Sequence, residues 1–488
     1  MSWLEAQGVT GFGRSSDKLS IFEADAGQRG IIAIQDIAEG EQLVRLPLRL
    51  ALTDHPRDEE SNRLVYEGAP WSVRLAAKLL REASKGEDSA WFPFIQALPT
   101  SINTPLDYEW EVLQQVEDPY MGQALDSAGW LTQDAYPRLD PHAIGNASRE
   151  EFEWAHQVVL SRTFGSAGED GGVGVRFLMP ILDMLNHGGD QTPLLLSDPP
   201  MAMDDVRWNL VAPDSSGSEQ DNWEIVLTAN KAVQANDEVL LSYGERGNDE
   251  FFGGYGFVPP RNPHEEMVLF GDTVEALEWH HHYYPPPNAE ESHSETSAKY
   301  ETVLETVQDQ EEAELKKLPA SIKSEGFLQD RKRIRIGAAD NLDGRLHAAY
   351  EGLARIEGRG MDHAFWAIML RCLELLQERS PILTDLSMLA DPARNPEPHE
   401  QAYWSTILQY YTNAIRWFDS SPFKAEQDEV LARRPQVERP EILGAEALPW
   451  SSQLSLVITF RTYKKMIAWD TVIALAAELN QVPLAPPR

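Results

Sequence analysis

Two short motifs, about 50 residues apart, constrain this chain more than any other feature, because each joins an apolar run to a cluster of hydrogen-bonding side chains. The first reads Met179-Pro-Ile-Leu-Asp183-Met-Leu-Asn186-His187. The second reads Glu238-Val-Leu-Leu-Ser-Tyr243-Gly244 and continues to Asn248 and Tyr255-Gly256-Phe257. Both apolar runs are typical of strands, so the polar groups fall where buried strands or turns end. This placement predicts a ligand site.

Each of these residues also has an ordinary structural role open to it. Asp183 could be a helix cap, His187 a core histidine, and Tyr243 and Tyr255 aromatic residues of a sheet. For any one residue alone that interpretation is favoured. The joint order of the motifs, together with the segments around them, reverses the preference.

The first 55 residues contain strand and turn signals. A short strand is expected at Leu19–Phe22. A tight turn at Gly27–Gly30 then leads into an apolar strand, and a second turn at Glu39-Gly40 leads into a strand that ends at Pro47. The pattern predicts a β-hairpin-like unit with a loop that exposes backbone groups.

Residues 56–160 have apolar residues at helical spacing and several tryptophans, which favour a helical insert with an aromatic core. A long amphipathic helix is expected at 150–164 and a glycine-rich linker at 165–172, which lacks the strand and helix that flank a dinucleotide-binding loop. Residues 188–222 are interpreted as a variable surface loop, and strands are expected at 223–228 and 266–270.

From about residue 295 the pattern is helical to the end, and it contains no catalytic motif. The run His280-His-His-Tyr-Tyr-Pro-Pro-Pro287 is interpreted as a solvated boundary loop. Adjacent histidines share no face of a helix or strand, so no metal site is expected.

Composition limits the classes of partner. The chain has 78 acidic and 42 basic residues and a net charge of −36, which disfavours nucleic acid and anionic membranes and suits a basic protein partner. A single cysteine, Cys372 in a leucine-rich run, cannot form an intramolecular disulfide and is expected to be a core thiol. The sequence contains no recognisable signal peptide and no long apolar run, so we expect a cytoplasmic or nuclear protein. We also expect the protein to be a monomer.

The two motifs resemble the carboxyl-terminal half of a SET-domain protein methyltransferase, and the Rubisco large-subunit methyltransferase-like branch in particular. The Trp91-x-Pro-x-x-x-x-Leu-Pro99 pattern and Ser161-Arg162-x-Phe164 are similar to the helical insert of that branch. The resemblance implies an α+β fold, a SET-domain β core of small twisted sheets split by a helical insert and followed by an all-α C-terminal domain. The expected boundaries are 1–55 and 161–275 for the core, 56–160 for the insert, and 290–488 for a helical substrate-binding domain.

The resemblance also implies roles for individual residues around S-adenosyl-L-methionine. Tyr243 is the expected catalytic residue, and Tyr255 is expected to line a lysine channel. The remaining positions are expected to hold the cofactor: Gly27, Gln28, Arg29, Arg162, Asp183, Asn186, His187 and Phe257. Gln28 stands where members of the family usually have the first glycine of Gly-x-Gly.

The expected activity is S-adenosylmethionine-dependent methylation of a lysine in a protein. Such a transfer needs two positioned reactants, excluded water and a neutral amine, and no metal. A non-histone target, such as a ribosomal protein, is expected because the chain lacks the cysteine clusters of many histone-methylating SET proteins. Two alternatives stay open: methylation of a protein histidine by the same fold, and a non-catalytic SET-fold protein that recruits a partner.

Overall fold

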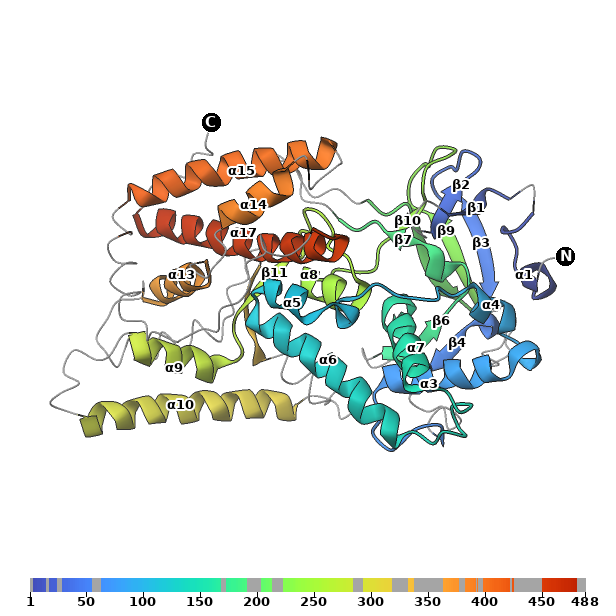
Figure 1. Cartoon of the computed structure of the whole chain (residues 1–488), viewed down its shortest axis with the longest axis horizontal. Helices are drawn as coiled ribbons and strands as arrows, with labels where there is room; N and C mark the ends of the chain where they lie inside the picture. The colour runs from blue at the N-terminus through green and yellow to red at the C-terminus, as the bar shows by residue number, and fades with distance from the viewer. Residues whose placement is uncertain are drawn as a thin grey trace. The chain divides into compact units, whose positions relative to one another are not determined.

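The computed structural model describes the chain in segments, and Figure 1 draws the helices and strands that they form. The described residues are 3–14, 17–23, 29–54, 63–167, 173–190, 203–212, 223–283, 293–317, 332–337, 363–376, 382–391, 393, 398–421, 424 and 450–480. The chain forms two compact units. The first comprises Met1–Asp107 and Leu125–Pro263, and the second comprises Tyr108–Ala124 and His264–Arg488.

A five-stranded sheet lies at the centre of the first unit. Its strands, in spatial order, are β3 (Gln42–Pro47), β9 (Glu224–Ala229), β8 (Val206–Val211), β10 (Leu240–Leu241) and β7 (Asn186–His187). β9 pairs antiparallel with both β3 and β8, whereas β10 runs parallel to β7 and β8. The two short parallel strands therefore join segments that are far apart in the sequence.

Two smaller sheets complete the β structure of this unit. One pairs β1 (Leu19–Glu23) with β2 (Arg29–Ala33), and the other has the order β4 (Leu52–Asp54), β6 (Val173–Leu178), β5 (Phe164–Ala167). The hairpin predicted over residues 27–47 is wrong in its pairing, because β2 pairs with β1 and β3 pairs with β9. β2 pairs with the strand before it, and β3 pairs with a strand almost 180 residues later in the sequence.

The helices of the first unit include α1 (Trp3–Ala6), α3 (Trp71–Ser84), α4 (Phe92–Ala97) and α7 (Arg149–Arg162). α7 begins with a capping box, in which the Ser148 hydroxyl accepts from the Glu151 N–H and the Glu151 carboxylate accepts from the Ser148 N–H. Its buried residues, such as Phe152 and Val159, pack in one core cluster with Val73 and Leu79 of α3. α7 ends at Arg162, where the backbone turns extended and enters β5.

Two predicted loops contain strands. The glycine-rich linker at 165–172 begins with the last residues of β5, and the variable loop at 188–222 contains β8. β8 alternates buried and exposed positions along the sheet, from buried Val206 to exposed Arg207. The surrounding Pro, Ser and Asp residues masked this short period in the sequence.

The second unit is mainly helical. Its elements are α5 (Trp110–Leu113), β11 (Glu266–Phe270), α9 (Thr273–Tyr283), α10 (His293–Lys316), β12 (Ile334–Gly337), α13 (His363–Leu376), α14 (Ile382–Ala390), α15 (Pro398–Asp419) and α17 (Ser452–Asn480). α6 (Pro119–Arg138) begins in this unit and ends in the first. β11 and β12 pair antiparallel, so the helical reading of this region missed one strand.

The histidine run was predicted wrongly as a solvated loop. His280 lies within α9 and is 1% exposed, and Tyr283 is also buried. Apolar neighbours such as Leu277, one turn earlier, draw this face of the helix into the core. Residues 284–287 of the run lie outside the described residues. Cys372 is buried in α13, as predicted.

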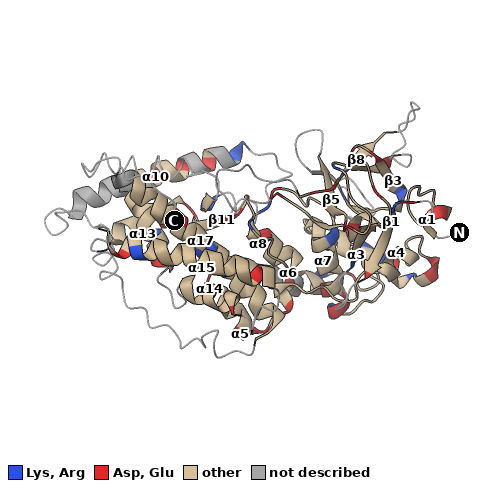
Figure 2. Cartoon of the chain, turned by 90° about the horizontal axis from the view of Figure 1, so that it is seen from above, with Lys and Arg blue, Asp and Glu red and all other residues tan. Residues whose placement is uncertain are grey.

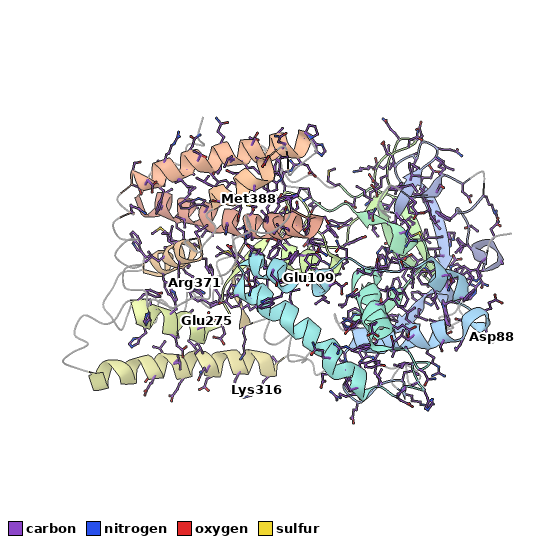
Figure 3. The ribbon with its side chains drawn as sticks, in the orientation of Figure 1. Asp88, Glu109, Glu275, Lys316, Arg371 and Met388 are labelled. Carbon is purple, nitrogen blue, oxygen red and sulfur yellow. The ribbon has the colours of Figure 1, made fainter. Side chains whose placement is uncertain are left out.

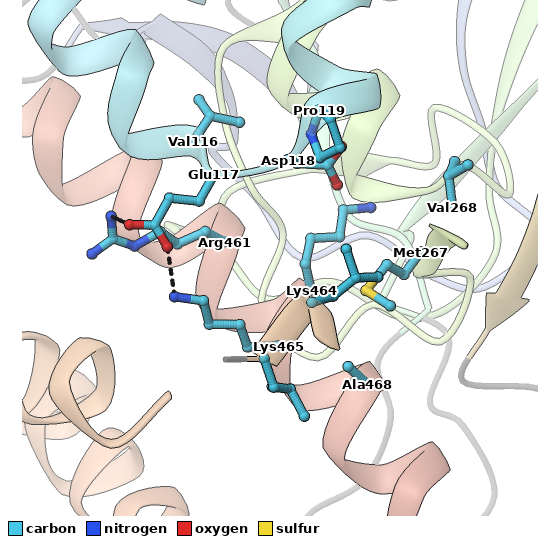
Figure 4. A pocket seen from close by; sticks show the side chains of 12 residues that line it. Val116, Glu117, Asp118, Pro119, Met267, Val268, Arg461, Lys464, Lys465 and Ala468 are labelled. Carbon is cyan, nitrogen blue, oxygen red and sulfur yellow. Dashed lines mark hydrogen bonds and ion pairs between the residues drawn. The ribbon is translucent and has the colours of Figure 1, made fainter. Parts of the chain in front are cut away.

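Buried charges hold the second unit together. Arg461 on α17 donates to the Asp385 carboxylate on α14 and to Glu117, and Lys465 donates to the same two carboxylates. Figure 4 shows Glu117 between Arg461 and Lys465 at the edge of a small pocket. These four residues form what we call the ion network.

A second polar cluster lies on α9 and α13. Arg371 donates to Glu374 at 2.7 Å and to the Leu269 carbonyl at 3.0 Å, and Glu275 accepts from the Tyr120 hydroxyl at 2.6 Å. Arg371 and Glu275 are labelled in Figure 3. Acidic residues are also spread over the surface of other elements, including α10 (Figure 2).

Candidate functional site

The pairing of β7 with β10 brings the two sequence motifs together. Leu240 lies opposite Asn186, and Leu241 lies opposite His187. The parallel direction places the residues that follow both strands at the same edge of the sheet. Figure 1 shows β7 and β10 side by side. Tyr243, two residues after β10, lies beside His187, with their ring centroids 5.2 Å apart.

His187 is fixed by the backbone of the second motif. The Tyr243 N–H donates to His187 Nδ1 at 3.1 Å. The ring nitrogen that accepts this bond carries no proton, so the neutral ring carries its proton on Nε2. Burial, with a smaller contribution from the Arg246 charge, lowers the pKa of His187 to about 4. His187 is neutral at physiological pH.

The Tyr243 hydroxyl is directed toward the first motif. It donates to the Leu185 carbonyl at 2.8 Å. Burial raises the pKa of Tyr243, and the nearby Asp183 and Glu238 charges act in the same direction. The hydroxyl therefore keeps its proton at neutral pH and cannot act as a base, but its oxygen can still accept a hydrogen bond.

Aromatic rings gather around these two residues. The His187 ring lies 4.6 Å from that of Phe251 and 5.8 Å from that of Phe257, and the Tyr243 ring lies 5.2 Å from that of Tyr255. We call these five side chains the aromatic group. It provides a largely apolar wall whose polar atoms are the Tyr243 and Tyr255 hydroxyls and the two ring nitrogens of His187.

Gly256 allows the aromatic group to form. Its φ of +77° belongs to the left-handed region that favours glycine, and a Cβ atom there would lie 1.9 Å from the Asn103 carbonyl oxygen. The turn carrying Tyr255 and Phe257 thus packs directly against backbone of the segment after α4. No side chain fits between them.

Arg162 and Asp183 form a pair behind this wall. Arg162 Nη1 donates to the Asp183 carbonyl at 2.7 Å and to its carboxylate Oδ2 at 3.2 Å. Burial raises the pKa of Asp183, while the Arg162 guanidinium opposes that shift. Among the described residues, buried Asp183 Oδ1 and Arg162 Nε have no hydrogen-bond partner. Such atoms are costly unless something else binds them.

The backbone before Asp183 is strained. Ile181 has a φ of +73°, an outlier for a β-branched residue, and its side chain is buried. It precedes the 3₁₀ turn Leu182–Met184 that carries Asp183. Strain of this kind persists where the surrounding structure demands it, and it gathers at functional sites.

Asn186 connects the first motif to β2. Its Nδ2 donates to the Arg29 carbonyl at 3.0 Å and to Glu238 Oε1 at 2.7 Å. The Arg29 guanidinium itself donates to the Ala97 carbonyl at 2.8 Å. Gly27 and Gln28, the other residues expected in this loop, lie outside the described residues.

The structure thus gathers most of the expected site residues around the ends of β7 and β10. Those described are Arg29, Arg162, Asp183, Asn186, His187, Tyr243, Tyr255 and Phe257. The sequence reasoning missed Phe251, whose ring packs on His187, and the role of Glu238 beside Asn186. Glu238 is the first residue of the second motif, but nothing in the sequence indicates that it lies beside Asn186.

No group of three or more His, Cys, Asp or Glu side chains among the described residues is arranged to hold a metal ion. Within the same residues, no helix is long and apolar enough to cross a membrane.

Known proteins are similar to this chain in sequence and in fold. No family model matches the chain. Curated relatives over about half of it include a ribosomal lysine N-methyltransferase of Schizosaccharomyces pombe, 26% identical over 245 residues, covering 49% of this chain and 41% of that protein. An actin-histidine N-methyltransferase of Rattus norvegicus is 27% identical, covering 49% and 39%. The chloroplastic Rubisco large-subunit N-methyltransferase of Nicotiana tabacum is 21% identical, covering 51% and 50%.

Solved structures match over nearly the whole chain. The SET domain of LSMT bound to lysine and AdoHcy has a TM-score of 0.57 at 16% identity, covering 98% of this chain and 90% of that one. Rubisco LSMT bound to sinefungin and monomethyllysine has a TM-score of 0.55 at 15% identity, covering 98% and 91%. The chain spans about half the length of the curated relatives it matches, so the comparisons concern the fold. The chain therefore has the fold of the LSMT SET-domain structures, and over about half of its length it is similar in sequence to protein methyltransferases of that kind.

Proposed function

We propose that this chain is an S-adenosylmethionine-dependent protein-lysine N-methyltransferase that acts on a non-histone protein. The observation that carries the proposal is the juxtaposition of Tyr243 with Asn186 and His187 at the ends of β7 and β10. The similarity to a ribosomal lysine N-methyltransferase and to a Rubisco large-subunit N-methyltransferase supports it, as does the fold shared with an LSMT SET domain bound to lysine and AdoHcy.

The side chains of the site match the chemical groups of the cofactor. S-adenosylmethionine supplies an electrophilic methyl group on a sulfonium, next to an ammonium, a carboxylate and an adenine. Arg162, with an unpartnered buried Nε among the described residues, suits the carboxylate. His187 and Phe257 offer faces suited to the adenine. Arg29, Asp183 and Asn186 complete the proposed cofactor set, with Gly27 and Gln28 in the adjoining loop.

Tyr243 is the proposed catalytic residue. With S-adenosylmethionine bound, the lysine ammonium would first lose its proton to water. The neutral nitrogen would then bond to the methyl carbon as the carbon–sulfur bond breaks, and the bonding electrons would stay on the sulfur of the departing S-adenosylhomocysteine. The Tyr243 hydroxyl stays protonated because its pKa is raised, and it is held by the Leu185 carbonyl. Its oxygen is then free to accept from the amine and to aim the nitrogen lone pair at the methyl group. Tyr255 lines the channel beside it, and the apolar wall favours the neutral amine.

The proposal also includes the domain boundaries, the charge of the substrate, the compartment and the oligomeric state. The core comprises residues 1–55 and 161–275, the insert 56–160, and a substrate-binding domain 290–488. The substrate is a basic protein, attracted by the net charge of −36, and the enzyme is a cytoplasmic or nuclear monomer that does not bind nucleic acid or membranes.

Methylation of a histidine is the second candidate, because the relatives include actin-histidine N-methyltransferases matched over about half of this chain. An imidazole nitrogen attacks the methyl group by the same displacement. The residue type found on the methylated protein separates the two candidates.

The test is transfer of labelled methyl from S-adenosylmethionine into a lysate of source cells that lack this protein, followed by mass spectrometry of labelled bands. Wild type should label a protein on lysine, and Tyr243→Phe should lower the rate about 100-fold, the usual scale for one aligned polar group. Tyr66→Phe, the same change at a half-buried tyrosine outside the site, is the matched control. Absence of both labelling and cofactor binding would leave a recruiting protein.

A further inference from the structure

We propose that Glu238 is a positioning residue that fixes the carboxamide of Asn186, so that Asn186 presents only its oxygen to the cofactor's ammonium group. This inference rests on the proposed function and assigns a role to a residue outside the expected site set.

The orientation of the Asn186 carboxamide follows from its two partners. Its nitrogen donates to the Arg29 carbonyl at 3.0 Å and to Glu238 Oε1 at 2.7 Å. A carbonyl and a carboxylate can only accept, so the NH₂ group must face both of them. Both amide protons are then used, and Asn186 Oδ1 faces the other way. Any ligand atom that meets Oδ1 must be a donor.

The charge of Glu238 favours a cationic donor. Its carboxylate accepts from the Asn186 amide nitrogen at 2.7 Å, and it therefore places a negative charge next to the carboxamide. The cofactor has two donor groups, a neutral adenine amine and a charged ammonium. A negative potential behind Oδ1 strengthens the bond to the ammonium more than the bond to the amine.

The fold makes room for this contact. A Cβ atom on Gly30 would lie 2.7 Å from Glu238 Oε1 and 2.6 Å from the Phe22 ring. Glu238 is also held by pairing of its strand with β2, where the Val239 N–H donates to the Ile31 carbonyl at 2.8 Å. A side chain at position 30 would therefore press on the Glu238 carboxylate where it approaches Asn186.

Calorimetry on the full chain tests the proposal with two ligands. S-adenosylhomocysteine carries the ammonium, whereas 5′-methylthioadenosine keeps the adenine and lacks the amino-acid part. We expect Glu238→Ala to weaken S-adenosylhomocysteine binding about tenfold, the scale of one charge-assisted hydrogen bond, and to leave methylthioadenosine binding unchanged. Glu238→Gln retains an acceptor for Asn186 and should stay within about threefold of wild type.

Coupling distinguishes positioning from a direct or general effect. In an Asn186→Ala background, Glu238→Ala should cause no further loss, because its effect passes through Asn186. Gly30→Ala should weaken S-adenosylhomocysteine binding in the same sense as Glu238→Ala. Glu39→Ala, at an exposed glutamate in the turn before β3, is the control for loss of charge.

Three results would overturn the proposal: wild-type affinity in Glu238→Ala, equal losses for both ligands, or a Gln variant as weak as the Ala variant. A wild-type chain that binds neither ligand would instead refute the proposed function, and the cofactor role of Glu238 with it. The two failures are therefore distinguishable in one set of titrations.

Discussion

Two buried aspartates, one in each unit, are each paired with an arginine, yet their surroundings differ. Asp385 in the ion network accepts from Arg461 on both oxygens and also from Lys465 at 3.0 Å. Asp183 accepts from Arg162 on Oδ2 alone, and among the described residues its Oδ1 has no partner. A carboxylate whose two oxygens both accept hydrogen bonds from the protein stabilises the fold. A carboxylate in a polar site with one oxygen left without a partner can still accept a hydrogen bond from a ligand.

The largest effect is expected from Asp385→Asn. The amide removes one of the two carboxylates that neutralise the buried cations Arg461 and Lys465 and leaves only Glu117, and breaking a buried ion pair costs about 3–5 kcal/mol. The free energy of unfolding of the second unit, measured by calorimetry on the full chain, should fall by that amount. Affinity for S-adenosylhomocysteine below the transition should stay at the wild-type value. A cost under about 1 kcal/mol would show that the network is not a structural one.

A smaller loss is expected from Gly256→Ala. A Cβ atom would press on the Asn103 carbonyl and the residue would remain at positive φ, which together cost about 3 kcal/mol. Gly244→Ala is the matched control, since Gly244 also has a positive φ but its nearest atom would be 3.9 Å away, and it should cost about 1 kcal/mol. Equal losses in thermal unfolding would mean that close packing of this turn is unimportant.

Asp183→Asn should affect ligand binding more than folding. Burial already raises the pKa of Asp183, so its folded state disfavours the charge, and removing that charge costs only about 1 kcal/mol through the weaker bond to Arg162. Affinity for S-adenosylhomocysteine should fall about tenfold, because Arg162 loses the group that aims it. Ligand affinity and the free energy of unfolding should be measured for this variant and for Asp385→Asn. Asp183→Asn should lose mainly affinity, whereas Asp385→Asn should lose mainly stability. Matching profiles would remove the distinction between the two aspartates.

The sequence was informative where function requires side chains in a fixed order. The SET fold and the motifs around Asp183 and Tyr243 could be predicted, because their residue types and spacing are unusual. The predicted helices near residues 150, 400 and 454 also occur, as α7, α15 and α17. Roles of the site residues stay predictions.

The sequence did not predict which strands pair, where two of the strands lie, or which side chains meet in the folded chain. β2 and β3 have turns on both sides, but partner choice depends on distant strands such as β9, which no local pattern encodes. β8 and β12 are short and flanked by polar residues, so their alternation was hidden. The position of Glu238 beside Asn186 depends on the β7–β10 register and was visible only in three dimensions.

The smallest predicted effect is a fall in the free energy of unfolding at acidic pH. His187 in the candidate site and His156, buried beside Ser72 in the first unit, both have pKa values lowered to about 4 by burial, whereas an unfolded histidine titrates near 6.5. Between these values the unfolded state binds more protons, so the free energy of unfolding falls as pH falls from about 6.5 to 4 and is flat above. For fully buried His156, a change from pH 7 to pH 6 costs about 0.7 kcal/mol.

The two histidines separate stability from binding. His156→Gln keeps a partner for Ser72 and should remove that part of the acid sensitivity of the first unit, without changing how cofactor affinity depends on pH. His187→Asn should change the pH dependence of affinity as well, because protonation of His187 Nδ1 would remove the acceptor of the Tyr243 N–H. Asp385→Asn, whose network contains no histidine, should leave both pH profiles of the first unit unchanged. A pH profile of S-adenosylhomocysteine affinity that responds equally to all three variants would mean that acid acts on global folding, and that the site and the network differ less than their hydrogen bonds indicate.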